Sequence, residues 1–421
     1  MSKKERRLSD EVTARMISAA IDRSERKPGQ AFAANPSILV LAGVGISVSI
    51  SFSVLLPVAP VLLERIGPHG AAGAATAALF AGAVVGELST PWLMSRWSAA
   101  RLLIAGQLLT AVPSLVYVFP RATAWQMLAA AGVRGLGMGV AIVVAVTLVA
   151  EFAAPKRRGR AIGYFGLALT GPSIALPPIG ISLLAAGHAD VAAAIAFFGG
   201  LAGALLALRL RSRRVPTPNV ADNLFVTLSR SDLLLLFGGF VLVSSSFGGI
   251  VTYAPVALPP EGLGSSAVFL LVSGTTRAAS RWLSGVLGDH HPARPILIGG
   301  IGLTGIGVIA LALHGGPPMI LLAATAFGTG FGAVQTGAYL AMMERGSKSN
   351  WSAISALWNC GIDLGAAFGG VLFGVSAALY GYGNAVWILP AVLLISLPLV
   401  WLPAKSGSVS VESESTAPRL T

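Results

Sequence analysis

The chain has 421 residues and a formal net charge of +12, and 54% of it is hydrophobic while only 11% is charged, against roughly 25% charged in a typical soluble protein. With a mean hydropathy of +0.77, so few charges could not keep the surface of a soluble fold hydrated, and intrinsic disorder would need a more polar chain. The composition therefore excludes both classes and indicates an integral membrane protein in contact with the lipid bilayer.

Twelve apolar segments are each long enough to cross a bilayer core of about 30 Å as a helix. They lie near 38–63, 71–95, 102–119, 124–150, 162–185, 191–209, 234–258, 266–288, 296–314, 318–343, 352–380 and 384–403. These long unbroken runs exclude a transmembrane β-barrel, whose strands alternate over about ten residues. Because lipid offers no partner to backbone groups, the predicted fold is an all-α membrane protein with twelve transmembrane helices.

The longest polar connection divides these spans six and six, which predicts two six-helix bundles. We expect the bundles at 37–209 and 233–403, a cytoplasmic linker at 210–232, and cytoplasmic tails at 1–36 and 404–421. In the first tail, apolar residues recur every four positions from Leu8 to Ala20. This spacing fits either an amphipathic helix on the membrane surface or a loosely ordered tail.

The basic residues predict the orientation, because cytoplasmic segments of membrane proteins carry an excess of Lys and Arg. With both termini inside, 24 of the 29 basic residues fall in cytoplasmic segments, and only Arg65 and Arg121 lie outside. We therefore expect a multi-pass protein of the cytoplasmic membrane. The positive charge is a topology signal, so nucleic acid is excluded as a partner.

Few residues in this chain could support metal or enzyme chemistry. Cys360 is the single cysteine and the five histidines are scattered, so we expect no internal disulfide, metal site or cofactor. The sequence also has no phosphate-binding loop and no nucleophile–base constellation. We expect a protein that is not an enzyme and that functions as a monomer.

An internal repeat links the two halves. The segment PWLMSRWSAARLLIAG (91–106) aligns without a gap to GVLGDHHPARPILIGG (285–300), and both follow the second span of their half. The second copy resembles the loop signature G-x-L-x-D-R-x-G-R-R of the major facilitator superfamily through Gly285, Leu287, Asp289 and Arg294. The first copy keeps Arg96 but departs from the signature at Pro91, Ser95 and Ser98.

Two further helices extend this resemblance to bacterial 12-helix drug and sugar efflux permeases. The fifth span carries GPSIALPPIG (171–180), similar to the G-P-x-x-G signature of exporters, with Ala175 in place of the last glycine. Pro172, Pro177 and Pro178 remove amide donors there, which predicts a hinge that includes Gly180. The eleventh span places Gly361, Gly365 and Gly369 on one face suited to close packing.

The resemblance implies two pseudo-symmetric bundles, the major facilitator fold, that move a small molecule by alternating access. It also suggests gating through ion pairs, for which the candidates are Arg96, Asp289 and Arg294 with the intramembrane Arg277 and Arg281. Proton-coupled efflux by an antiporter is the leading expectation. The alternative is proton-coupled uptake of a small organic anion or metabolite.

Five ionisable side chains lie within predicted spans, where a charge costs about 2.5–3.5 kcal/mol unless it is paired or hydrated. They are Glu87, Arg134, Arg277, Arg281 and Asp363. Glu87 and Asp363 are candidates for binding the coupled proton. The alternatives are hydrogen bonds at a helix end for Glu87 and a permanent ion pair with Arg277 or Arg281 for Asp363.

Substrate contacts are expected from polar and aromatic side chains on the same helices. Arg134 could attract an anionic substrate, or it could form a salt bridge with Glu87. Other candidates are Tyr253, Gln335, Tyr339, Trp358 and Asn359, whose alternative role is ordinary helix packing. The three arginines within spans outnumber the two acids, so one positive charge is not compensated. This favours a substrate with an anionic or polar acceptor group.

Overall fold

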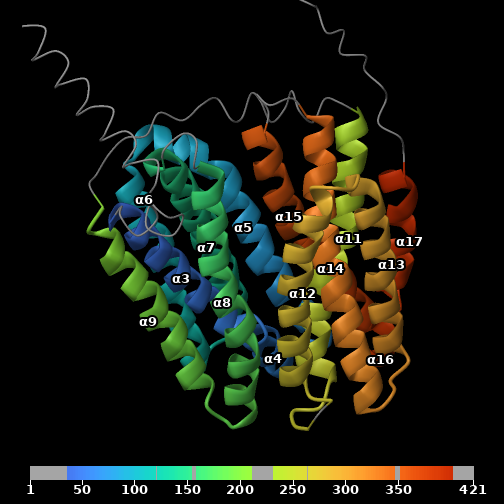
Figure 1. The fold of residues 1–421 in the computed structure, drawn as a ribbon. Helices are drawn as coiled ribbons and strands as arrows, with labels where there is room; N and C mark the ends of the chain where they lie inside the picture. Colours follow the sequence, from blue (N-terminus) through green and yellow to red (C-terminus); the bar gives the residue numbers. More distant parts are fainter. Residues whose placement is uncertain are drawn as a thin grey trace, which may run out of the picture.

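A computed structural model of the chain describes residues 36–119, 121–153, 158–210, 231–262, 264–346 and 351–401. Within these ranges every regular element is a helix (Figure 1). The predicted tail at 404–421 lies outside them, and so do nearly all of the tail at 1–36 and of the linker at 210–232.

The described helices divide into two halves. The first half holds α3 (Pro36–Leu55), α4 (Val58–Ile66), α5 (Ala71–Arg96), α6 (Ala99–Ala111), the 3-10 helix η1 (Val112–Val118), α7 (Ala124–Phe152), α8 (Arg158–Ala185) and α9 (Ala189–Ala207). The second half holds α11 (Ser231–Ala257), α12 (Ser266–Gly288), α13 (Ala293–Ala312), α14 (Pro317–Arg345), α15 (Trp351–Tyr380), α16 (Tyr382–Ala385) and α17 (Ile388–Trp401). Each of the twelve predicted spans coincides with one of these helices or with an adjoining pair.

Eleven of the described spans are both long and apolar enough to cross a membrane. The twelfth, α12, has 23 residues but is less apolar, because Arg277, Arg281 and several serines lie on it. We refer below to the two ends of the molecule by a residue at each. The Pro36 end holds the start of α3 and the end of α17, and the Gly70 end holds the turn between α4 and α5.

The first predicted span is two helices rather than one. Proline has no amide hydrogen and fixes its φ angle, and Pro57 separates α3 from α4 while Pro60 follows in the first turn of α4. At the break, the Leu56 amide donates to the Ser53 carbonyl over 3.4 Å instead of making a full helical turn. The break therefore leaves carbonyl groups at the end of α3 available to other partners.

Glycines bring the helices of each half into backbone contact, as is common where lipid replaces water. In the first half, Gly82 and Gly86 of α5 face the backbone of α7, and Gly135 and Gly139 of α7 face α5. In the second half, the predicted close-packing face of α15 is confirmed, since its glycine stripe (Gly361, Gly365 and Gly369) lies against α11.

A seam between the two halves runs along α5 from the Gly70 end. Gly70 and Gly73 pack against the backbone of Gly370 and Gly374 on α15. One turn further along α5, the Thr252 hydroxyl of α11 donates to the hydroxyl of Thr76 over 2.7 Å, with both residues buried. At this end the halves are therefore in direct contact.

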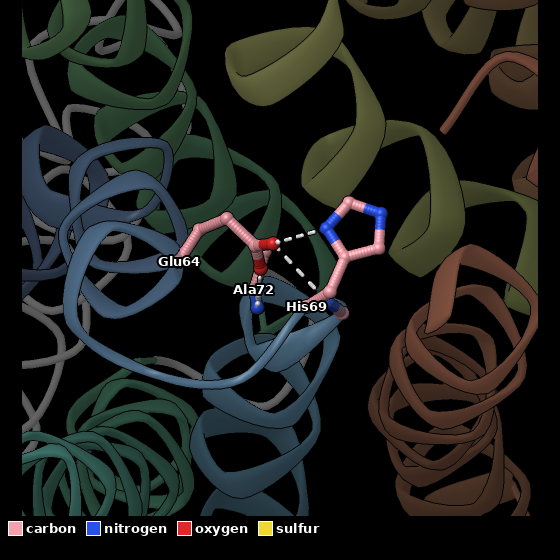
Figure 2. A network of polar contacts seen from close by, with 4 residues as sticks. Glu64, His69 and Ala72 are labelled. Atoms are coloured by element: carbon pink, nitrogen blue, oxygen red, sulfur yellow. Dashed lines mark hydrogen bonds and ion pairs between the residues drawn. The ribbon is translucent and has the colours of Figure 1, made fainter. Parts of the chain in front are cut away.

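Glu64 fixes the turn at the Gly70 end, as Figure 2 shows. Its carboxylate accepts hydrogen bonds from the amides of Gly70 (3.1 Å) and Ala72 (2.9 Å) at the start of α5, where a negative charge is favourable. His69 Nδ1 lies 3.2 Å from the same carboxylate. The His69 ring also meets Tyr382 of α16 edge-on at 4.8 Å, so this network reaches the second half.

Candidate functional site

The two predicted proton carriers come together from different halves of the chain. Glu87 lies on α5 and Asp363 on α15, and their carboxyl groups are close enough to interact. The Asn359 amide, one turn before Asp363, donates to the Glu87 carboxylate. Glu87 is 8% exposed and Asp363 9%, so the two acids and the amide form a nearly enclosed carboxyl pair across the seam.

The two arginines of α12 contact aromatic rings rather than carboxylates. The guanidinium of Arg277 lies 5.1 Å from the centre of the Phe247 ring, and that of Arg281 lies 5.6 Å from the Trp358 ring. In the described part of the chain neither forms a salt bridge, so the expected ion pair with Asp363 is absent from this conformation. Arg277 is half-buried and Arg281 is exposed, which leaves both accessible to a solute.

A row of aromatic rings crosses the seam next to Arg277. Phe80 of α5 meets Phe52 of α3 at 6.1 Å and Phe247 of α11 at 6.2 Å, both edge-on. Phe247 in turn stacks on Phe331 of α14 at 5.2 Å. Along α5 the order from the Gly70 end is Thr76, Phe80, Glu87, so this apolar layer separates the threonine contact from the carboxyl pair.

Gln335, Tyr339 and Trp358 form one cluster between α14 and α15. The Trp358 indole donates to the Gln335 carbonyl over 2.8 Å, and its ring meets Tyr339 edge-on at 5.5 Å. Tyr339 exchanges a hydrogen bond of 3.1 Å with Ser355. The side-chain oxygen of Gln335 is buried and has no hydrogen-bond partner.

Arg134 lies elsewhere, inside the first half. It is 1% exposed, and its guanidinium donates to the carbonyls of Ser51 (2.6 Å) and Thr110 (3.2 Å) and lies 5.8 Å from the Tyr117 ring. The predicted salt bridge with Glu87 is not formed among the described residues. In this conformation the side chain is held by backbone carbonyls near the ends of α3 and α6, and its contact with substrate stays a prediction.

Tyr253 is also not placed to contact a substrate in this conformation. It is 2% exposed, its ring meets Phe373 edge-on at 5.7 Å, and its hydroxyl lies 3.4 Å from His314 Nε2. These contacts are near the Gly70 end of the second half. The packing role is the one that this geometry supports.

The predicted gating residues at the Pro36 end do not pair with each other among the described residues. Arg96 lies 4.2 Å from the Trp92 ring, and Arg294 lies 4.8 Å from the Trp401 ring and donates to the Trp401 carbonyl. Asp289 follows the last turn of α12 and is exposed. The role of these three residues in gating stays a prediction.

The proline segment lies within one continuous helix, α8, which runs through Pro172, Pro177 and Pro178. Gly180 has a packing function, since a side chain there would meet the Val54 carbonyl near the end of α3. One turn before Pro177, Ile174 faces Gly274 of α12 in the other half. The hinge stays a prediction, and the segment does lie at a contact between the halves.

Sequence reasoning missed the aromatic row and the contacts at the Gly70 end. Phe80, Phe247 and the pair Thr76–Thr252 lie in apolar spans where a Phe or Thr is unremarkable, so no local signal marks them. Glycine pairs at 70–73 and 370–374 were the only hint available. A cleft of about 370 Å³ also opens at the Gly70 end beside Glu64, Arg65 and Pro260, away from the carboxyl pair.

Comparison with known proteins agrees with this architecture. The sequence profile of the Major Facilitator Superfamily matches residues 41–345 and 262–420. A curated relative, the 3-(3-hydroxy-phenyl)propionate transporter of Escherichia coli K12, is 27% identical over 213 residues, which are 49% of this chain and 50% of the relative. The aligned part thus spans about half the length of that relative.

Solved structures show the same fold at low sequence identity. A POT family transporter in complex with 5-aminolevulinic acid has a TM-score of 0.69 at 12% identity, covering 86% of this chain and 95% of that one. The xylose transporter XylE from E. coli, in a partially occluded inward-open conformation, has a TM-score of 0.63 at 14% identity, covering 88% and 98%. With its sequence match and its two helical halves, the chain belongs to the Major Facilitator Superfamily.

Proposed function

We propose that this protein is a secondary transporter that carries a small organic anion together with a proton across the membrane. The observation that carries the proposal is the carboxyl pair, Glu87 and Asp363, whose members belong to different halves. Two adjacent carboxylates in apolar surroundings repel each other, so a proton bound between them holds the halves together there. Releasing that proton favours separation of the halves, which is the movement that alternating access requires.

The arginines supply the anion site. Arg277 and Arg281 are accessible, lie over aromatic rings and have no carboxylate partner among the described residues. Arginine suits a carboxylate because its guanidinium can donate two parallel hydrogen bonds. The compound for which the curated relative is named, an aryl propionate, agrees with a site that combines guanidinium groups and rings.

The same arrangement favours symport over antiport. A bound anion near the carboxyl pair is stabilised when the pair carries a proton, because the proton removes a negative charge that would repel it. Each ligand then raises the affinity for the other, so both load on the same side. Efflux by antiport is the second candidate, supported by the G-P-x-x-G-like segment of α8 at its contact with α12.

The test uses purified protein in proteoliposomes with radiolabelled 3-(3-hydroxyphenyl)propionate. We expect an inward proton gradient to drive accumulation, and a protonophore to abolish it. Glu87→Gln and Asp363→Asn should each lower gradient-driven transport at least tenfold, while Glu151→Gln, which removes an exposed carboxyl of α7, should leave it unchanged. Loss of preloaded substrate under the inward gradient would instead establish antiport, and no transport in either direction would overturn the anion proposal.

A further inference from the structure

Gln335 is one of two buried amides in the described helices whose side-chain oxygen lacks a partner, and the other, Gln107, is tied to the Val44 carbonyl inside the first half. Gln335 is 5% exposed, yet its side-chain oxygen has no hydrogen-bond partner. A buried polar group without a partner costs about 1–3 kcal/mol, so natural proteins seldom keep one unless something binds there. The cost is most simply explained if a ligand group completes the hydrogen bond during function.

The surroundings of Gln335 indicate what kind of ligand this is. On α14, Phe331 precedes Gln335 by one turn and Tyr339 follows it by one turn, so all three lie on the same face. The backbone carbonyl of Gln335 accepts a hydrogen bond from the Trp358 indole. The guanidinium of Arg281 lies over the ring of Trp358. Thr336, the next residue, donates to the Arg281 carbonyl over 3.2 Å, which places α12 and its arginines beside this part of α14.

The cluster therefore offers three kinds of contact within a small region. Guanidinium groups at Arg277 and Arg281 suit a carboxylate, and rings at Phe247, Phe331 and Trp358 suit an aromatic ring. The Gln335 amide suits a hydroxyl group, which can donate to the amide oxygen. A short chain between carboxylate and ring would let one molecule reach all three.

Resting on the anion transport proposed above, we propose that Gln335 determines specificity by binding a ring hydroxyl of an aryl carboxylate substrate. The arginines select for the carboxylate, and Gln335 selects hydroxylated over unsubstituted rings. A site that provides a buried partner for a hydroxyl discriminates against the analogue that lacks it, because the partner is then left unsatisfied.

The experiment compares 3-(3-hydroxyphenyl)propionate with 3-phenylpropionate in proteoliposomes under an inward proton gradient. The unmodified protein should prefer the hydroxylated acid by about tenfold in kcat/KM, mainly through a lower KM. Gln335→Leu should abolish the preference by raising KM for the hydroxylated acid relative to KM for 3-phenylpropionate. Gln335→Glu keeps an acceptor and should retain part of the preference.

Thr325→Val is the matched control, because Thr325 is an exposed residue of the same helix whose hydroxyl bonds only within α14. Binding is followed in parallel as a rise in melting temperature in detergent, which also shows whether each variant folds. Equal transport of both acids by the unmodified protein, or an undiminished preference in Gln335→Leu, overturns the role of Gln335 alone. If neither acid binds or is carried, the anion proposal itself fails, which is a distinguishable result.

Discussion

The guanidinium of Arg134 shows how the fold selects among the roles that the sequence leaves open for a charged residue within a span. An arginine within a span predicts either a functional contact or a structural partner, and here its partners are the carbonyls of Ser51 and Thr110. The break at Pro57 places the end of α3 within reach. A cation at the C-terminal end of a helix is favourable because carbonyl groups there lack intrahelical donors.

We expect Arg134→Ala to destabilise the protein by about 3 kcal/mol, since two hydrogen bonds from a charged donor are lost and the carbonyls remain buried. The melting temperature should fall by several degrees, while KM of the folded fraction stays unchanged. The measurement can use reaction of a fluorescent maleimide with Cys360, which is buried in the folded protein. A variant with normal stability but a raised KM would show that Arg134 contacts substrate after all.

At the scale of the helices, close approach at the Gly70 end depends on residues without side chains. A Cβ atom at Gly73 would lie 2.6 Å from the Gly374 Cα, a distance that forces α5 and α15 apart. Overpacking of this kind costs about 1–3 kcal/mol, which changes the population of the contact by about fivefold to more than a hundredfold. The seam is therefore sensitive to a single methyl group.

Gly73→Ala should shift the protein towards a conformation that is open at the Gly70 end, and transport should fall about tenfold. The shift is measured as the distance between spin labels at Asp190→Cys and Glu261→Cys in a Cys360→Ser background. Gly302→Ala provides the control, because no atom lies within 4 Å of the added Cβ position. An unchanged distance distribution in Gly73→Ala would show that the seam tolerates the added methyl group and would contradict this prediction.

At the scale of the whole molecule, the distribution of basic residues predicts that the Pro36 end is cytoplasmic. In a Cys360→Ser background, His69→Cys and Glu261→Cys should react with a membrane-impermeant maleimide in intact cells. Asp289→Cys should react only after permeabilisation. The reverse labelling pattern would show that the charge bias misassigns the orientation, and the inside and outside of the transport cycle would be exchanged.

Helix number, helix type and the division into halves were all predictable, because lipid permits few solutions for a long apolar chain. Twelve spans, the internal repeat and the close-packing glycines of α15 follow from local patterns alone. The break in the first span was harder to predict from the sequence, although Pro57 and Pro60 indicated it. A proline within a span either kinks a helix or ends it, and neighbouring contacts determine which occurs.

The candidate site was predictable in its members but not in its pairings. The sequence by itself determined that Glu87, Asp363, Arg277 and Arg281 are costly in lipid and need a reason to be there. Only the tertiary structure decided that the two acids face each other across the seam, that the arginines lie over Phe247 and Trp358, and that Gln335 keeps an open acceptor. The physical reason is that residue type alone shows which side chains need a partner or water within a membrane, whereas the partner itself depends on how helices from distant parts of the chain approach one another.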